Sequence, residues 1–193
     1  MNDHGNVPPP QRVTALLALA NQGDVESLNA LFETLYGELH ALARARLRRS
    51  APITVLDTTS LLHESYLKLV KSGALNIENR IHFLAYASRT MRSIIVDFAR
   101  RRLADRRGSG AEHLPIDTNV SDRAAPSGEE EIVRVHDALE ELAQSEPRLA
   151  RVVEMRYYGG MDETEIAQVL GVTDRTVRRD WHKARLILSL ALA

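Results

Sequence analysis

Apolar residues recur at intervals of three and four along most of this chain, and no segment alternates apolar and polar residues as a half-buried strand does. An interval of three to four residues places side chains on one face of an α-helix. The pattern is clearest within residues 25–49, at Leu28, Leu31, Phe32, Leu35, Leu39 and Leu42. The sequence therefore predicts an all-α fold, in which each helix turns one apolar face toward a core.

Glycine, proline and small polar residues indicate where these helices begin and end. The spacing of apolar residues predicts helices over residues 13–20, 25–49, 58–71, 80–106 and 132–142. A further helix is expected to begin after Ser145, with Ser145 as its N-cap because a serine hydroxyl can accept from a free backbone N–H. Pro147 would then lie in the first turn, where proline is tolerated.

Residues 108–128 interrupt the helical pattern, since they contain glycine, serine, proline and aspartate with little apolar periodicity. We interpret them as a flexible linker between two small helical domains. The predicted organisation is a disordered tail at 1–11, a helical bundle at 12–107, the linker at 108–128 and a helix-turn-helix domain at 129–193.

Composition narrows the classes of function. The chain has no cysteine, which excludes disulfides and thiolate sites, and its seven histidines show no metal-ligand spacing, so we expect neither a metal nor a cofactor. Phosphate-binding, dinucleotide and nucleophile-elbow motifs are absent, so we expect no enzyme and assign no catalytic residue. No apolar run approaches the roughly 20 residues of a membrane span, and the N-terminus does not resemble a signal peptide. These features predict a cytoplasmic protein.

The net charge of −1 hides a segregation of charge along the chain. Residues 89–107 hold seven arginines and two aspartates, a net charge of +5, whereas residues 112–146 hold ten acids and two arginines, a net charge of −8. Residues 174–185 are basic again. A solvated helix face explains either basic patch alone, but two patches separated by an acidic connector suggest two contacts with a polyanion.

The clearest motif is a helix-turn-helix at residues 162–188. Its first helix is followed by Gly171, which supplies the left-handed backbone conformation that a tight turn needs. Thr173 or Asp174 can cap the second helix. The apolar positions of the second helix recur at four, three and four residues and are expected to face the core, at Val177, Trp181, Ala184 and Leu188.

The opposite face of this second helix is basic, which suits the major groove of DNA. Arg178 and Arg179 are candidates for base contacts because arginine pairs bidentately with guanine. Arg175, Thr176 and Lys183 are candidates for phosphate contacts, which fix the register without reading the sequence. An amphipathic helical hairpin with a charged outer face is the alternative interpretation.

Longer stretches resemble a known family. Residues 142–173, LAQSEPRLARVVEMRYYGGMDETEIAQVLGVT, are similar to region 4 of bacterial sigma-70-type factors. Four upstream segments resemble region 2 of the same family, at 31–36, 57–70, 83–92 and 97–102. Both regions occur in order over residues 13–190 without an extra domain, so the chain resembles the small extracytoplasmic-function (ECF) group of sigma factors.

The resemblance implies a transcription initiation factor whose partners are core RNA polymerase and promoter DNA. Region 2 would bind the β′ clamp helices and melt the −10 element, whereas region 4 would read the −35 element and contact the β flap. By position in the family pattern, the polymerase-binding candidates are Asp57, Leu61, Glu64 and Lys68.

The resemblance also places a loop that captures an unstacked −10 base at residues 73–79. Asn76 and Asn79 could hydrogen-bond the Watson–Crick edge of such a base, although forming the turn and the helix cap explains these asparagines equally well. Contacts with the phosphates of the strand, which are sensitive to salt, are expected at Arg80, Arg89, Arg92 and Arg100.

The sequence departs from the family pattern in two places. ECF factors usually carry carboxylates just after the position of Asp57, where Thr58, Thr59 and Ser60 stand here. Phosphorylation of one of these hydroxyls by a Ser/Thr kinase would restore the negative charge for polymerase binding, while capping of the helix by the hydroxyls is the alternative. An anti-sigma factor is the other regulatory partner that this family implies. Asp180 stands where many relatives are basic, and it would repel phosphate or accept from cytosine.

A conventional regulator with a helical sensor domain is the main competing function. Such a protein would bind duplex DNA without polymerase, as a dimer on a palindrome. A sigma factor should bind DNA weakly alone and direct core polymerase to promoters. The few basic side chains of the recognition helix favour the sigma factor, with the helix-turn-helix as one half of a bipartite DNA reader.

Overall fold

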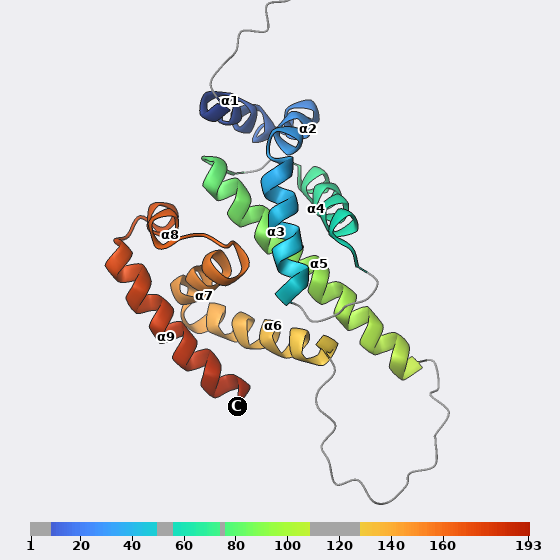
Figure 1. The fold of residues 1–193 in the computed structure, drawn as a ribbon, viewed down its shortest axis with the longest axis vertical. Coiled ribbons are helices and arrows are strands. Elements are labelled where there is room, and N and C mark those ends of the chain that lie inside the picture. Colours follow the sequence, from blue (N-terminus) through green and yellow to red (C-terminus); the bar gives the residue numbers. More distant parts are fainter. Residues whose placement is uncertain (1–8, 50–55, 74–75, 109–127) are drawn as a thin grey trace, which may run out of the picture.

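The computed structural model of the chain describes residues 9–49, 56–73, 76–108 and 128–193, so most of the expected tail and linker lies outside the described residues. All regular elements of the described residues are helices, as predicted (Figure 1). In chain order they are α1 (Pro9–Ala20), α2 (Val25–Thr34), α3 (Tyr36–Arg49), α4 (Thr58–Ser72), α5 (Arg80–Gly108), α6 (Gly128–Ser145), α7 (Pro147–Val153), the π-helical turn η1 (Glu154–Tyr158), α8 (Glu163–Leu170) and α9 (Asp174–Leu192).

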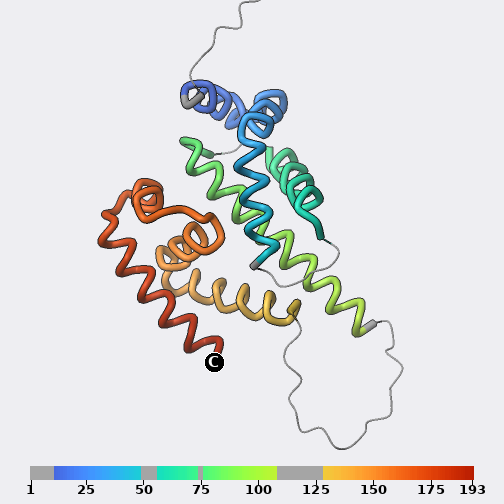
Figure 2. Tube along the Cα trace, in the orientation of Figure 1, coloured from blue at the N-terminus to red at the C-terminus, as the bar shows by residue number. Residues whose placement is uncertain are grey.

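Helices α1 to α5 enclose one apolar core, which we call the first half of the molecule. Phe32 makes edge-to-face ring contacts with Tyr66 and Phe83, at centroid distances of 5.1 and 5.8 Å. Figure 2 shows the 29-residue α5 running past α3 and α4, on both of which it packs. The most deeply buried side chains of this core include Leu17, Leu31, Leu39, Leu61, Leu69, Phe83 and Met91.

The single helix predicted over 25–49 is wrong in one respect, because two helices, α2 and α3, meet at Leu35. The backbone of Leu35 leaves the helical conformation, with φ −103° and ψ 10°. Next to it, the hydroxyl of Thr34 donates to the carbonyl oxygen of Ala30 at 2.6 Å, a bond of the kind that bends helices. Leu35 and Leu39 both stay buried, so the bend keeps the apolar stripe on the core.

Helices α6 to α9 form the second half, which has two small cores. One core includes Leu139 and Leu149, the other includes Val152 and Val177, and Trp181 packs against both. The predicted inward position of Trp181 is therefore confirmed. Its indole ring joins the two cores into one folded unit.

The junction between α6 and α7 corrects the predicted cap. Helix α6 continues through Ser145, whose hydroxyl donates to the carbonyl oxygen of Glu141 at 3.1 Å instead of capping α7. Pro147 lies in the first turn of α7, as predicted. After α7, the turn η1 closes at Gly159, where a β-carbon would collide with the carbonyl oxygen of Met155. The turn can therefore close in this way only around a glycine.

The two halves lie against each other along α5 (Figure 1). Helix α6 and the turn η1 both pack on α5. Ile81 and Leu84 of α5 contact a core of the second half, and Ile132 of α6 contacts the core of the first half. The domain boundary at 108–128 stays a prediction, but the described parts of the two halves share a packed interface.

Candidate nucleic-acid interface

The helix-turn-helix is formed by α8, a short turn and α9. Asp162 and Glu165 make a capping box at the start of α8, in which the Asp162 carboxylate accepts from the Glu165 N–H at 2.8 Å. Gly171 ends α8 in the left-handed conformation, with φ 64° and ψ 36°, as predicted. Thr173 then caps α9, its hydroxyl oxygen accepting from the Thr176 N–H at 3.3 Å. Local residues therefore define both ends of α8 and the start of α9.

Helix α9 lies at an edge of the molecule (Figure 1). Its basic side chains are exposed. The side chains of Arg178, Arg179 and Lys183 are 60%, 70% and 53% exposed. Each forms an ion pair with an acid of the second half, namely Glu163, Asp180 and Glu146 respectively. The pairs of Arg178 and Lys183 are at least partly exposed at both partners, so they contribute little and exchange readily. Arg179 is itself exposed although its partner Asp180 is buried, so all three cations face solvent and can meet a polyanion.

The other two α9 candidates differ in accessibility. Arg175 is exposed at the N-terminal end of the helix, where a recognition helix approaches DNA most closely. Thr176 is half-buried, and its hydroxyl oxygen lies 3.0 Å from that of Thr173. Thr176 therefore supports the cap of α9 as well as lying near the candidate surface.

Asp180 is not on the exposed basic face, which corrects the prediction for this residue. Its side chain is 4% exposed and accepts a hydrogen bond of 2.6 Å from Nε of Arg148 on α7. Asp180 follows Val177 by three residues and precedes Ala184 by four, so it shares the inward face of α9. The spacing is visible in the sequence, whereas Arg148, 32 positions away, carries no local signal.

Three of the four α5 arginines predicted to bind phosphate are at the surface. Arg89 is exposed and forms no ion pair with the described residues. Arg80 pairs with Glu38 of α3, within the first half. Arg100 pairs at 2.9 Å with Asp137 of α6, which belongs to the second half.

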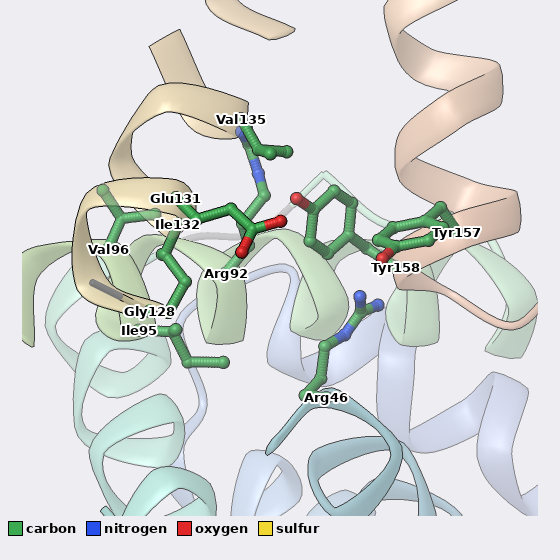
Figure 3. Close-up of a pocket in the computed structure, with 10 residues that line it drawn as sticks. All are labelled: Arg46, Arg92, Ile95, Val96, Gly128, Glu131, Ile132, Val135, Tyr157 and Tyr158. Carbon is green, nitrogen blue, oxygen red and sulfur yellow. The ribbon is translucent and has the colours of Figure 1, made fainter. Parts of the chain in front are cut away.

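The fourth arginine, Arg92, lies in the contact between the halves (Figure 3). Its side chain is only 6% exposed and donates to the carboxylates of Glu154 and Glu140, at 2.6 and 3.0 Å. One of its guanidinium nitrogens also lies 2.8 Å from Nδ1 of His136. Burial, and after it the positive charge of Arg92, lowers the pKa of His136. In this arrangement Arg92 cannot reach a phosphate, which corrects its predicted availability.

A small cavity lies beside Arg92, between residues of α3, α5, α6 and η1 (Figure 3). The ring centroid of Tyr158 is 4.7 Å from the guanidinium carbon of Arg46 and 5.7 Å from that of Arg92. One aromatic ring of the second half thus covers two buried arginines of the first. Burial raises the pKa of Tyr158. Sequence reasoning missed Arg46 and Tyr158, because nothing local to either residue indicates the other.

The two asparagines of the predicted base-capturing loop have different surroundings. Asn79 caps α5, its side-chain oxygen accepting from the His82 N–H at 2.9 Å, which favours the structural interpretation of this residue. Asn76 is exposed and borders a cleft of about 240 Å³. Tyr86 and Arg89 of α5 form other parts of that cleft, so Asn76 keeps its place as a candidate for base contact.

The predicted polymerase-binding residues on α4 are partly at the surface. Glu64 and Lys68 are exposed, and Lys68 pairs with Asp97 of α5 at 2.9 Å. Leu61 is completely buried in the core of the first half. Its predicted contact with polymerase is therefore corrected, because its side chain holds α4 in the bundle and does not reach the surface.

The N-cap of α4 is Asp57 and not one of the hydroxyl residues that follow it. The Asp57 carboxylate accepts from the backbone N–H groups of Thr59 and Ser60 at 2.8 and 2.9 Å, and from the Ser60 hydroxyl at 2.8 Å. The hydrogen bonds from Ser60 are the main reason why the pKa of Asp57 is lowered. Thr58 is half-buried, whereas Thr59 and Ser60 are exposed.

A helical first half built on a long basic helix, followed by a capped helix-turn-helix, defines a DNA-binding protein with two basic helices. The ECF sigma factor family matches residues 10–192, nearly the whole chain, so the protein belongs to the ECF sigma factors. A search of curated proteins found no match. The members of this family are non-enzymatic transcription initiation factors, and membership implies core RNA polymerase and promoter DNA as partners.

Two absences concern the described residues only. Within residues 9–49, 56–73, 76–108 and 128–193, no helix is both long and apolar enough to cross a membrane. In the same residues, histidine and acidic side chains form no cluster that could hold a metal ion.

Proposed function

We propose that this sigma factor directs core RNA polymerase to specific promoters by reading the −35 element with α9 and holding the melted −10 element along α5. The observation that carries this proposal is the exposed row of Arg178, Arg179 and Lys183 on a helix capped in helix-turn-helix geometry. Arg178 and Arg179 are the proposed base-reading residues. Arg175 and Lys183 are the proposed phosphate contacts.

The polymerase surface is proposed to lie on the outer face of α4, at Asp57, Glu64 and Lys68. All three residues are exposed and lie on one helix or at its cap, which suits a charged contact with the β′ clamp helices. A second contact, with the β flap, is proposed for an apolar groove of about 760 Å³ in the second half. Tyr157 and Leu186 line this groove and are exposed.

Phosphorylation at the start of α4 is proposed to control polymerase binding, with Thr59 as the acceptor for a Ser/Thr kinase. Thr59 is exposed, whereas Thr58 is half-buried and the Ser60 hydroxyl donates to Asp57. A phosphate on Thr59 would lie in the first turn of α4, where the helix dipole favours negative charge. It would supply the acid that the family pattern has just after Asp57. Control by an anti-sigma factor is the competing proposal.

Run-off transcription with purified core polymerase and genomic fragments tests the sigma function, and core binding tests the control. Thr59→Glu and the kinase-treated wild type are expected to bind core more tightly than the untreated wild type. Thr59→Gln, which has the size of glutamate without its charge, is the matched control and should show no gain. Equal core binding by all forms would overturn phosphorylation control, and no core binding by any form would overturn the sigma function.

A further inference from the structure

The cleft of about 240 Å³ that Asn76 borders is built from both halves of the chain. Its α5 residues include Tyr86 and Arg89, which are three positions apart and so share one face of the helix. Arg151 of α7 and Glu154 of η1 line it from the second half. Each half therefore contributes an arginine to the same cleft.

These two arginines carry positive charge that the described residues do not neutralise. Arg89 and Arg151 are exposed, and neither forms an ion pair with the described residues. The acid that lines the cleft, Glu154, is mostly buried and accepts from Arg92 at 2.6 Å, so its charge is already compensated. The cleft therefore favours an anion. Phosphate is the natural candidate, because the fork of guanidinium donors matches its oxygens.

The cleft also has a surface for a flat aromatic group. Tyr86 is 38% exposed, so its ring is open to a ligand. Ile77 and Met155 are buried where they line the cleft and add an apolar lining to it. Nucleobases stack on exposed aromatic rings of this kind, whichever base they are. An aromatic ring beside two cations thus suits a base joined to phosphate.

The loop at the border of the cleft is held in place by a side chain from the turn between α1 and α2. The Nδ2 of Asn21 donates to the carbonyl oxygen of Ile77 at 2.9 Å, and its Oδ1 accepts from the Ile77 N–H at 3.1 Å. Asn76, directly before Ile77, is exposed. Its amide has donors and an acceptor, which can pair with the polar edge of a base. The polar group that would read a base therefore stands on an anchored backbone.

We propose that this cleft binds a free nucleoside phosphate. The base stacks on Tyr86 and pairs with the amide of Asn76. Arg89 and Arg151 bind the phosphates. The cleft is smaller than the roughly 300–1,000 Å³ of sites that enclose a drug-sized ligand, so it takes the base and leaves the phosphates at the exposed arginines. The inference goes beyond the proposed function, which gives no role to Tyr86 or Arg151.

Fluorescence anisotropy with N-methylanthraniloyl derivatives of ATP and GTP tests the site in the full-length chain, without polymerase or DNA. The wild type is expected to bind at least one of them, and the unlabelled nucleotide should displace it. Arg89→Ala and Arg151→Ala should each weaken binding about 10- to 100-fold, because each removes a charge-assisted contact with phosphate. Both residues are exposed, so both variants should fold.

Arg44→Ala is the matched control for charge. Arg44 is also an exposed arginine, but it lies on α3 and does not line the cleft. This variant should bind the labelled nucleotide like the wild type. If the wild type binds neither nucleotide, or if Arg44→Ala weakens binding as much as Arg151→Ala does, the proposed site is overturned.

A second pair of variants tests whether the base is bound as well as the phosphates. Tyr86→Phe keeps the ring and should bind like the wild type, whereas Tyr86→Leu should bind about 5-fold or more weakly because stacking is lost. Inorganic pyrophosphate should displace the labelled nucleotide much less well than the unlabelled nucleotide does. Equal binding by the two Tyr86 variants, or equal displacement by pyrophosphate and nucleotide, would overturn the assignment of a nucleoside.

Single-stranded DNA carries the same bases and phosphates and is the other source of this chemistry. A single-stranded oligonucleotide is expected to bind Arg151→Ala as it binds the wild type, because the proposed −10 contacts lie on α5. If the oligonucleotide instead needs Arg151 while neither nucleotide binds, the cleft takes a DNA strand and the free ligand is overturned. A chain that binds nucleotide but supports no transcription with core polymerase would overturn the proposed function and leave the nucleotide site standing.

Discussion

The two basic helices of this chain, α5 and α9, differ in the ion pairs and in the exposure of their arginines. On α9, the side chains of Arg178 and Arg179 pair with acids of the same half and remain well exposed. On α5, Arg92 and Arg100 pair with acids of the other half, and Arg92 is buried by doing so. The availability of α9 is therefore a local property of the helix-turn-helix, whereas that of α5 depends on how the halves are arranged.

The largest effect is expected from removing Arg92. The loss of unfolding free energy would show how strongly this residue binds α5 to the second half. Arg92→Ala leaves the carboxylates of Glu140 and Glu154 without their cation, and breaking a buried pair typically costs about 3–5 kcal/mol. Urea denaturation should show a loss of about 3 kcal/mol, the lower end, because Glu140 is half-exposed. Arg89→Ala, on the same helix but exposed, should stay within about 0.5 kcal/mol. Equal losses for the two variants would remove the distinction between them.

The next effect concerns α9 and separates base reading from phosphate binding. Arg178→Ala is expected to weaken promoter binding by the polymerase-bound protein about 10- to 100-fold, since a good arginine–guanine pair contributes about 1–3 kcal/mol of discrimination. Lys183→Ala should weaken all sequences alike and lower the salt slope by about one. Fluorescence anisotropy with promoter and scrambled duplexes measures both quantities. If Arg178→Ala also weakens both duplexes equally, Arg178 reads no base.

A smaller effect decides between the two interpretations of Asn79. Asn79→Ala should lower the free energy of unfolding by about 1 kcal/mol, because α5 loses its N-cap. Asn79→Asp keeps a capping oxygen and should keep most of that stability. Transcription assays then distinguish the roles, because aspartate supports the cap but presents no amide to a base. We expect Asn79→Asp to transcribe like the wild type, and a large loss of transcription would return Asn79 to the base-capturing surface.

The smallest effect is a pH dependence at the contact between the halves. The pKa of His136 is lowered from 6.5 on folding, so the folded chain binds this proton less readily than the unfolded chain. The stability is complete above pH 6.5 and falls as the pH decreases from there toward the folded pKa. His136→Asn should remove this dependence in urea titrations between pH 7 and 5. The carboxylates of Asp57 and Glu129, whose pKa values are also lowered, lose their contributions only below their ordinary values of 3.8 and 4.5, so the two ranges are separate. An unchanged pH profile in His136→Asn would contradict the assignment.

Features that depend on neighbouring residues could be predicted from the sequence. Gly171 and Thr173 fix the turn of the helix-turn-helix through their own backbone and side-chain preferences, and both predictions are confirmed. The break at Leu35 could not be predicted from apolar spacing, because the leucines keep the same period on both sides of it. Next to the break, the Thr34 hydroxyl donates to the carbonyl oxygen of Ala30, a bond that the spacing of the leucines does not predict.

The parts of the candidate site whose exposure follows from helix periodicity could be predicted. Ion pairs between residues far apart in the sequence could not. Arg178 and Arg179 could be placed on the outer face of α9 because they lie between the apolar positions that face the core. The buried pairs of Asp180 with Arg148 and of Arg92 with Glu140 could not be predicted, since each pair joins residues 32 or more positions apart. Leu61 shows a limit of prediction from family resemblance. The family pattern assigns a role to this position but does not say whether its side chain is buried, and here it is.

Trp181, which joins the two cores of the second half, also gives the chain a natural optical probe. It is the one tryptophan of the sequence, and the guanidinium carbon of Arg156 lies 4.9 Å from its ring centroid. Its emission therefore reports on the second half alone, whereas far-ultraviolet circular dichroism sums over every helix. Melting curves from the two signals coincide when both halves unfold as a single cooperative unit and separate when they do not. Comparing these two melting curves thus measures, without any added label, how strongly the unfolding of the two halves is coupled.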